Sequence, residues 1–359
     1  MKAHHRSPSY FAAFLALIVA FSSLNAPSFA NAPAKQSSRV TESRSIANAI
    51  EQQLANGWSL PMRVAVAPAS SYPKIAIDNN SFAHVIWREN GNIFYSTNSS
   101  GAEWSIPLNL SNNPSSNSIT GFITSDVNGI VHVVWDIYNQ DVGQDSFIIY
   151  RSFMPAVGWS PPTTIATGYR LAGPSIAAST ASGVHVVFIG GWNTSGAHVY
   201  YVHKSNTGPW EPAERITSDT AANWNYSPHV IIDSLNRPHV AWWGNPQQKY
   251  SYRSQTGNWS TDESVEAGND PTLALGSGNT VYSLGHNIWD SMYLCERPDQ
   301  GSWACQKIPG SPDYLGVSLN QPSLISDDQG RLYAVWRGVY LAIRSSSGTW
   351  QQPALIANG

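Results

Sequence analysis

The chain has 359 residues, and only 12% of them are charged, whereas about a quarter of the residues in an ordinary soluble domain carry charge. The net charge of −3 gives no support to nucleic-acid binding, which needs a concentrated basic surface. A composition with 15 Trp, 16 Tyr, 27 Gly and 23 Pro favours a β-rich, turn-rich fold over a helical one.

Residues 1–30 have the pattern of a secretory signal peptide. Lys2 and Arg6 precede an apolar run at 11–21, and small residues at 28–32 offer cleavage after Ala30 or Ala32. No later stretch reaches the roughly 20 apolar residues of a membrane helix, so no membrane span is expected. The sequence therefore predicts a secreted, extracellular protein, with the periplasm as the alternative location.

Residues 31–56 are predicted to be a linker that contains one short helix. Ile46, Ile50 and Leu54 recur every four residues, and Gly57 supplies a stop. The following segment, residues 57–68, has the pattern of a spare β-strand.

One pattern recurs six times between residue 57 and the end of the chain at residue 359. A turn residue stands five positions after the first residue of a copy, and an aromatic residue stands fourteen after it. The clearest copies are PKIAIDNNSFAHVIWR (73–88), PSIAASTASGVHVVFI (174–189), PHVIIDSLNRPHVAWW (228–243) and PSLISDDQGRLYAVWR (322–337). Two further copies deviate slightly, with Gly121 in place of the initial Pro (121–136) and Gly285 in place of the aromatic residue (271–286).

Each copy continues through a third apolar segment, a Gly-containing turn, a Trp and a fourth short segment. Four short strands in a repeat of about 50 residues are typical of a β-propeller blade. Such a blade is apolar on both faces and can bury them only against neighbouring blades. We therefore expect an all-β propeller over residues 57–359 with six four-stranded blades, or seven. Either residues 57–68 or the C-terminal segment 350–359 completes the last blade.

Cys295 and Cys305 are the only cysteines, and they flank a turn-like RPDQG sequence. In an oxidising compartment this spacing predicts a disulfide across one hairpin, with two free thiols as the alternative.

At this level of organisation the chain resembles the sialidase-like propellers with BNR or Asp-box repeats. The resemblance rests on HVVW-type strands alternating with turns that lead to Trp, as in YSTNSSGAEWSIP (95–107). The resemblance implies exo-sialidase activity as one hypothesis, in which Arg88, Arg337 and Arg170 would bind the carboxylate of sialic acid and Asp136 would be the catalytic acid. The Asp of the family's box is missing from the repeats, so the resemblance supports the architecture more than the activity.

The strand-two-to-strand-three loops and the connections between blades should lie on one face of the propeller. The position fifteen after each repeat start then reads, around the ring, Arg88, Asp136, Ile189, Trp243, His286 and Arg337. His286, Arg337, Arg88 and Asp136 would form a polar crescent, in which two arginines suit a ligand carboxylate. The alternative is that Asp136 and Glu89 simply neutralise the arginines.

Loops of the same face add aromatic residues, namely Trp192, Trp224, Tyr226 and Trp289. Aromatic platforms beside Asn, Asp and Arg suit the apolar faces and hydroxyls of sugars. His84, His132, His185 and His239 recur once per repeat, so they should spread around the ring as structural residues rather than converge on a metal. No metal or cofactor is expected.

Three functions remain open on this basis. The first is a monomeric, non-catalytic binder of a glycan or cell-surface polysaccharide, and we favour it because arginines near Asp136 oppose the raised pKa that a catalytic acid needs. The second is an enzyme on acidic glycans, either a sialidase-like glycoside hydrolase or a polysaccharide lyase in which His286 or a Tyr abstracts the proton. The third is a protein-interaction scaffold.

Overall fold

The structure is a computed structural model that describes residues 62–66, 70–99, 101, 103–113, 117–139, 144–193, 196–218, 225–245, 247–286, 291–311, 322–336 and 340–355. The predicted signal peptide and the predicted helix between Ile46 and Leu54 lie outside these residues. No helix in the described ranges is long and apolar enough to cross a membrane.

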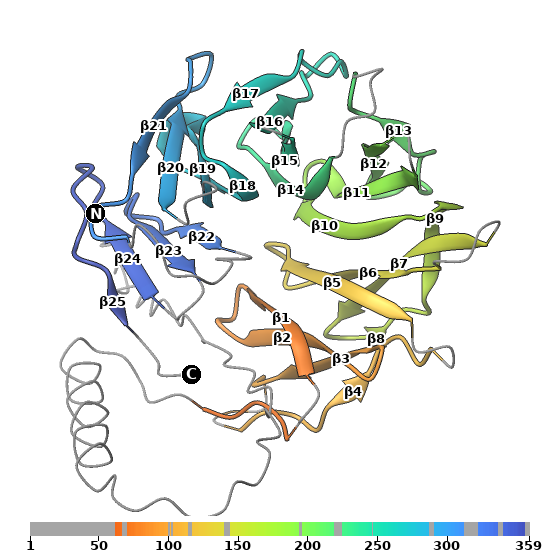
Figure 1. The fold of residues 1–359 in the computed structure, drawn as a ribbon. Coiled ribbons are helices and arrows are strands. Elements are labelled where there is room, and N and C mark those ends of the chain that lie inside the picture. Colours follow the sequence, from red (N-terminus) through yellow and green to blue (C-terminus); the bar gives the residue numbers. More distant parts are fainter. Residues whose placement is uncertain are drawn as a thin grey trace, which may run out of the picture.

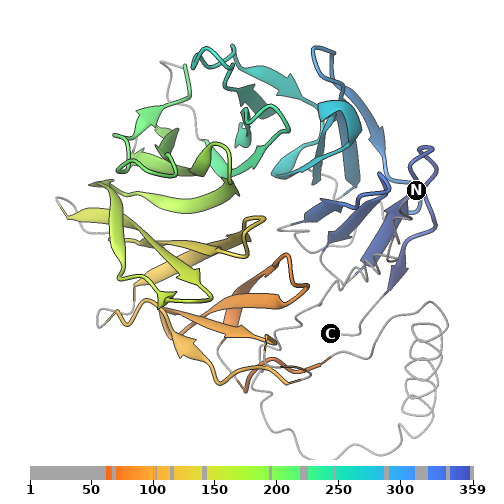
Figure 2. The same ribbon diagram turned by 180° about the vertical axis from the view of Figure 1, so that it is seen from behind.

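Six antiparallel sheets are arranged around one axis, so the protein is a six-bladed β-propeller (Figures 1 and 2). The first three blades consist of β1 (Ser70–Ile77), β2 (Ala83–Glu89), β3 (Asn92–Thr97) and β4 (Leu108–Asn109); β5 (Ser118–Ser125), β6 (Val131–Ile137), β7 (Asp145–Met154), β8 (Gly158–Trp159) and β9 (Thr163–Tyr169); and β10 (Ala172–Ser179), β11 (Gly183–Asn193), β12 (Gly196–Lys204) and β13 (Glu214–Arg215). The last three blades consist of β14 (Tyr226–Ile232), β15 (Pro238–Gly244), β16 (Gln247–Tyr252) and β17 (Glu263–Val265); β18 (Asn269–Leu275), β19 (Val281–His286), β20 (Met292–Arg297) and β21 (Ala304–Lys307); and β22 (Ser323–Ser326), β23 (Leu332–Trp336), β24 (Tyr340–Arg344) and β25 (Ala354–Leu355).

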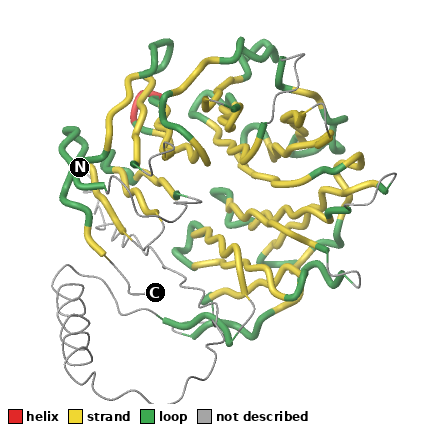
Figure 3. The backbone as a smooth tube through the Cα atoms, viewed as in Figure 1, coloured by secondary structure: helices red, strands yellow, loops and turns green. Residues whose placement is uncertain are grey.

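Every blade is built from consecutive strands, with the first strand innermost (Figure 1). Figure 3 shows in the same view that loops and turns connect the strands around the ring. The fifth strand of blade 2 arises because its outer edge is divided into β8 and β9, which both pair with β7. In blade 2, Trp159 of β8 pairs with the end of β7. The equivalent residues Trp210, Trp259 and Trp350 of other blades form single β-bridges at the end of the third strand or directly after it. The single helical turn among the described residues is η1 (Ser277–Asn279), between β18 and β19.

The C-terminal strand β25 completes the last blade by pairing with β24. Of the two candidates for this strand, the C-terminal segment is therefore the one used. The described part of the N-terminal candidate, residues 62–66, has no strand structure.

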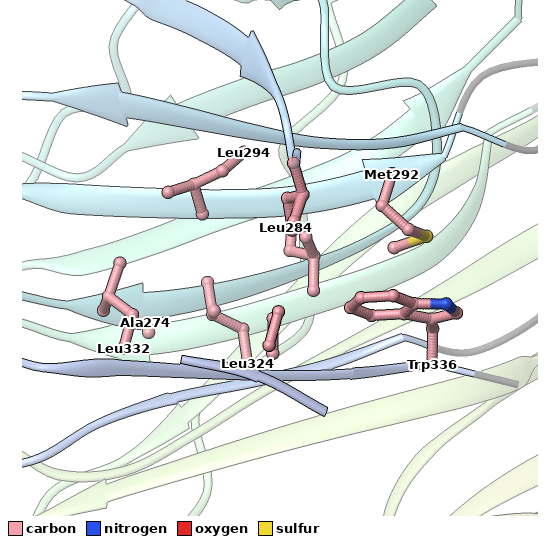
Figure 4. Packing of buried hydrophobic residues seen from close by; sticks show 10 residues of the cluster. Ala274, Leu284, Met292, Leu294, Leu324, Leu332 and Trp336 are labelled. Carbon is pink, nitrogen blue, oxygen red and sulfur yellow. The ribbon is translucent and has the colours of Figure 1, made fainter. Parts of the chain in front are cut away.

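Apolar side chains are buried mainly between blades. Separate clusters join blades 1 and 2, 2 and 3, 3 and 4, 4 and 5, and 5 and 6. Between blades 5 and 6, Leu284 and Met292 pack against Leu324 and Trp336 (Figure 4). Because neighbouring sheets provide the partners, an isolated blade would expose both of its apolar faces.

The expected disulfide is confirmed. Cys295 on β20 and Cys305 on β21 are directly opposite each other in the hairpin and form the bond. The bond encloses a short loop, with a sequence separation of 10.

Replacing both cysteines by alanine should lower the free energy of unfolding by about 2 kcal/mol, at the lower end of the usual range because the loop is short. Urea unfolding of the double variant would measure this loss. Reduction of the wild-type protein should give a similar shift in the unfolding midpoint, and an unchanged midpoint in both experiments would contradict the expectation.

Candidate functional site

The loops between second and third strands and the connections between blades lie on one face, which we call the loop face. In blades 1 and 2 the two kinds of segment are hydrogen-bonded to each other. The backbone N–H of Ser118 donates to the Gly91 oxygen at 3.1 Å, and that of Tyr138 donates to the Asn117 oxygen at 3.1 Å. This contact agrees with the face expected from the repeat.

A β-bulge interrupts the innermost strand of blades 1 to 5 where that strand enters from the loop face. The residue just before the repeat start adopts a positive φ in four blades: 52° at Tyr72, 60° at Gly173, 47° at Ser227 and 48° at Asp270. Bulges re-aim side chains and are common beside functional sites, and non-glycine residues in this conformation carry strain. The bulges therefore bring the residues just before the repeat starts, among them Ser227 and Asp270, to the loop face. The spacing of the repeat does not reveal this change of direction.

Asp136 is fully buried among these bulges. Its Oδ1 accepts the Thr120 N–H at 2.7 Å, while its Oδ2 accepts the Thr120 hydroxyl at 3.3 Å and the Gly173 N–H at 3.2 Å. This carboxylate thus joins the bulges of blades 2 and 3, an arrangement suited to holding the two blades together.

Arg88 lies at the end of β2 and is partly buried. Its Nε donates to the Ser118 carbonyl oxygen of blade 2 at 2.9 Å. Within the described ranges Arg88 forms no ion pair with Asp136 or Glu89, and Glu89 instead accepts the Trp87 indole N–H at 3.3 Å. The Arg88 guanidinium is therefore anchored through Nε to the backbone of blade 2. Whether carboxylates neutralise Arg337 stays a prediction, because that residue lies outside the described ones.

Five side chains gather on the loop face of blades 4 and 5. Tyr226 and Trp243, paired across β14 and β15 and both partly exposed, stack with ring centroids 5.3 Å apart and an interplanar angle of 22°. Ser227 donates to Asp270 Oδ1 at 2.8 Å, and Asp270 Oδ2 lies 3.5 Å from His286 Nε2. We call this set the rim cluster; it combines an aromatic platform with a hydroxyl, a carboxylate and an imidazole.

The rim cluster differs in accessibility between its members. The His286 side chain is buried, whereas the Asp270 side chain keeps 28% of its surface exposed. Burial raises the pKa of Tyr226, so this phenol is a neutral hydrogen-bonding group at physiological pH. Ser227, Asp270 and Tyr226 are therefore the polar members through which a ligand could be contacted.

The remaining predicted residues are scattered. Ile189 is buried in the core, and the Arg170 guanidinium lies 5.2 Å from the ring centroid of Tyr169. For Trp192 only the backbone, in β11, is described, and Arg337, Trp224 and Trp289 lie outside the described residues. The structure thus brings together Tyr226, Trp243 and His286, while Arg88 and Asp136 lie on blades 1 and 2.

The repeated histidines belong to a framework that joins neighbouring blades. In blade 1, His84 Nδ1 lies 2.7 Å from the Tyr95 hydroxyl, and Tyr95 packs edge-on against Trp159 of blade 2. Equivalent groups of three are His132–Tyr150–Trp210, His185–Tyr201–Trp259 and His239–Tyr250–Trp303. Each histidine is thus hydrogen-bonded within its own blade, and the described residues contain no group of three or more potential metal ligands.

Sequence reasoning missed three side chains that meet near the axis, Lys74, Phe122 and His229. They occupy the position directly after the repeat start in blades 1, 2 and 4. The Lys74 Nζ lies 4.6 Å from the Phe122 ring centroid, and the rings of Phe122 and His229 are 5.8 Å apart. Comparing this repeat position in all six copies would have assigned the three residues to one ring, but it would not have shown that their side chains are in contact.

No protein-family model matches this sequence, and the comparison with curated proteins gives no match. Among solved structures the chain is similar to an α-L-arabinanase from Penicillium chrysogenum complexed with arabinobiose, with 12% identity, a TM-score of 0.57 and coverage of 79% of this chain and 95% of that one. A lectin from Burkholderia pseudomallei gives 15% identity, a TM-score of 0.57 and coverage of 83% and 86%. An inactive variant of virginiamycin B lyase from Staphylococcus aureus with quinupristin gives 10% identity, a TM-score of 0.54 and coverage of 82% and 87%. At these identities the likeness establishes the fold, and the structures that share it include a lectin and a glycan-acting enzyme.

Proposed function

We propose that this protein is a secreted, non-catalytic propeller that binds a carbohydrate on its loop face, with the rim cluster as the main contact surface. The observation that carries this proposal is the partly exposed Tyr226–Trp243 stack beside the Ser227–Asp270 hydrogen bond. An aromatic face covers the C–H surface of a pyranose, and carboxylate and hydroxyl groups bind its hydroxyls. Secretion agrees with the signal-like residues 1–30 and with the Cys295–Cys305 disulfide.

The site chemistry favours binding over hydrolysis. Glycosidases of the usual kind need two carboxylates placed on either side of the glycosidic bond. Asp136 is fully buried and accepts hydrogen bonds from two neighbouring bulges, so a substrate would not reach it. Asp270 is accessible, and the rim cluster as defined contains no second carboxylate to pair with it. The similar solved structures include a lectin and an arabinanase complexed with arabinobiose, so both a binding and a hydrolysing protein have this fold.

The test is a glycan-retention experiment with the mature protein immobilised. A pool of neutral, sialylated and uronate-bearing glycans is applied, and both the eluted and the unbound fractions are identified by mass spectrometry. Retention of chemically unchanged glycans is the expected result. Released sialic acid or unsaturated products would show turnover and overturn the non-catalytic assignment, and a pool recovered entirely unbound would overturn carbohydrate binding.

Trp243→Ala should weaken binding of the retained glycan at least about tenfold, because truncating a central Trp of a binding surface typically costs about 2 kcal/mol or more, and about 1.4 kcal/mol is a factor of ten. Isothermal titration calorimetry measures the change. Tyr200→Ala is the matched control, since Tyr200 is also a partly buried ring stacked on another ring, Phe188, but lies in the middle of β12. Equal loss of affinity in both variants would point to unfolding rather than to a contact.

A further inference from the structure

The residues directly after each repeat start form an inner ring around the axis of the propeller. They are Lys74, Phe122, Ser175, His229, Thr272 and Ser323. Side chains from blades that are not neighbours meet here, since Phe122 of blade 2 contacts His229 of blade 4 at 5.8 Å between centroids. Contact across blade 3 is possible because the ring residue of that blade is the small Ser175, whose hydroxyl accepts the Val230 N–H at 3.3 Å.

Lys74 brings a cation without a polar partner to this place. Its ammonium lies over the Phe122 ring at 4.6 Å, and within the described residues it forms no hydrogen bond and no ion pair. Burial lowers the pKa of Lys74 to about 8, and the charge of Asp270 opposes this shift without a direct contact. At neutral pH the amine is therefore mostly charged, desolvated and able to gain from an anionic acceptor.

His229 supplies a second donor beside Lys74. Its Nδ1 accepts the Leu273 N–H at 3.2 Å, so the proton of the neutral imidazole is on Nε2. Burial and the nearby Lys74 charge lower the pKa of His229 to about 3, which keeps the ring neutral at physiological pH. Within the described part of the chain no acceptor faces Nε2, and the ring is partly exposed.

The inner ring adjoins the rim cluster. His229 and Ser227 lie on the same strand β14, and Ser227 donates to Asp270, whose charge acts on Lys74. A sugar on the Tyr226–Trp243 platform would thus lie next to two N–H donors near the axis. Charge-assisted hydrogen bonds to a carboxylate are the strong ones among such contacts.

We infer that Lys74 and His229 bind the carboxylate of an acidic sugar, so that the glycan recognised at the rim cluster is a uronate-bearing one. This inference rests on the proposed carbohydrate-binding function. It assigns acid recognition to an inner-ring lysine and histidine, whereas the sequence pointed to the arginines at position fifteen.

The experiment compares wild-type protein, Lys74→Met, Lys74→Arg and Lys249→Met on a glycan pool that contains neutral oligosaccharides, trigalacturonate and the methyl ester of trigalacturonate. Esterification removes the charge and leaves the sugar in place. Lys249 is a matched control because it is, like Lys74, a partly buried lysine on a strand, and its ammonium already donates to the Ser264 hydroxyl at 2.9 Å. Retained species are identified by mass spectrometry, and affinities for trigalacturonate and its ester are measured by calorimetry.

Wild-type protein and Lys249→Met should bind trigalacturonate at least about tenfold more tightly than its ester, whereas Lys74→Met should lose this preference and keep its affinity for uncharged glycans. Lys74→Arg should restore part of the preference, which shows that charge rather than packing is responsible. The inference is overturned if Lys74→Met keeps the preference, or if the wild-type protein retains neutral glycans alone. If wild-type protein retains nothing from the pool, the proposed function itself falls and this inference falls with it.

Discussion

Replacing Gly285 by Trp, the aromatic residue that most repeats carry at this position, should destabilise the protein by more than about 3 kcal/mol. The equivalent residues Trp87, Trp135, Phe188, Trp242 and Trp336 are all buried, so a consensus argument would expect the opposite. In blade 5 the backbone of the connection from blade 4 passes so close to Gly285 that it leaves no room for a side chain. A Cβ at Gly285 would lie 2.7 Å from the Ala267 carbonyl oxygen and 2.9 Å from that of Asn269. Backbone atoms cannot swing aside as a flexible side chain does, so the cost is that of an overpacked core.

Urea unfolding of Gly285→Trp and Gly285→Ala measures the effect, with about 1–3 kcal/mol expected for the alanine variant. Gly168→Ala is the matched control, because a Cβ there would make an ordinary 3.5 Å contact with the Leu171 side chain. That variant should be neutral or slightly stabilised, since alanine loses less conformational freedom than glycine in a strand. If the Gly285→Trp protein were as stable as wild type, the claim that backbone oxygens exclude a side chain at this position would be wrong.

Stability should fall as the pH drops below about 6.5, and His185 should be a main contributor. His185 is buried, and it is hydrogen-bonded to the Tyr201 hydroxyl at 2.6 Å and to the Ser182 hydroxyl at 2.9 Å. Burial, aided by the charges of His203 and Arg253, lowers its pKa to about 3. Between pH 6.5 and 3 the unfolded chain therefore binds a proton that the folded protein does not. The stabilising contribution is complete above pH 6.5 and is lost as the pH falls towards 3, by about 3 kcal/mol at pH 4.

Urea unfolding at several pH values between 7 and 4.5 tests this, because carboxylates such as Asp233, whose pKa is lowered to about 2, stay charged there. His185→Asn should flatten the pH dependence, since Asn offers a polar atom near Tyr201 without titrating. Ser179→Asp should also flatten the pH dependence, but by raising the pKa of His185 rather than by removing the imidazole. Ser179 occupies the repeat position at which blade 4 carries Asp233, whose Oδ2 lies 3.1 Å from His239 Nε2, and a carboxylate there should raise the pKa of His185. A slope that neither variant changes would show that other groups govern acid unfolding.

The candidate site was only partly predictable. Reading one repeat position around the ring found Trp243 and His286, and the loop residue Tyr226 was found from its type. The predicted polar crescent of His286, Arg337, Arg88 and Asp136 stays a prediction, because Arg337 lies outside the described residues. For two of its members the structure adds contacts that the repeat does not encode: Asp136 accepts from Thr120 and Gly173, and the Arg88 guanidinium donates to the Ser118 oxygen. These contacts arise at the bulges where the innermost strands of blades 1 to 5 begin. A bulge leaves the repeat spacing unchanged but redirects the side chains before the repeat start.

The sequence by itself determined the architecture. A strict repeat with four short strands and apolar residues on both faces can be satisfied only by blades that pack against one another, and two cysteines flanking one turn can meet across that hairpin. The tertiary structure alone decided which polar groups converge. Lys74, Phe122 and His229 are separated by dozens of residues and come from blades 1, 2 and 4. Only the curvature of the ring brings them to one axis, and no local pattern encodes a distance that is set by the packing of several sheets.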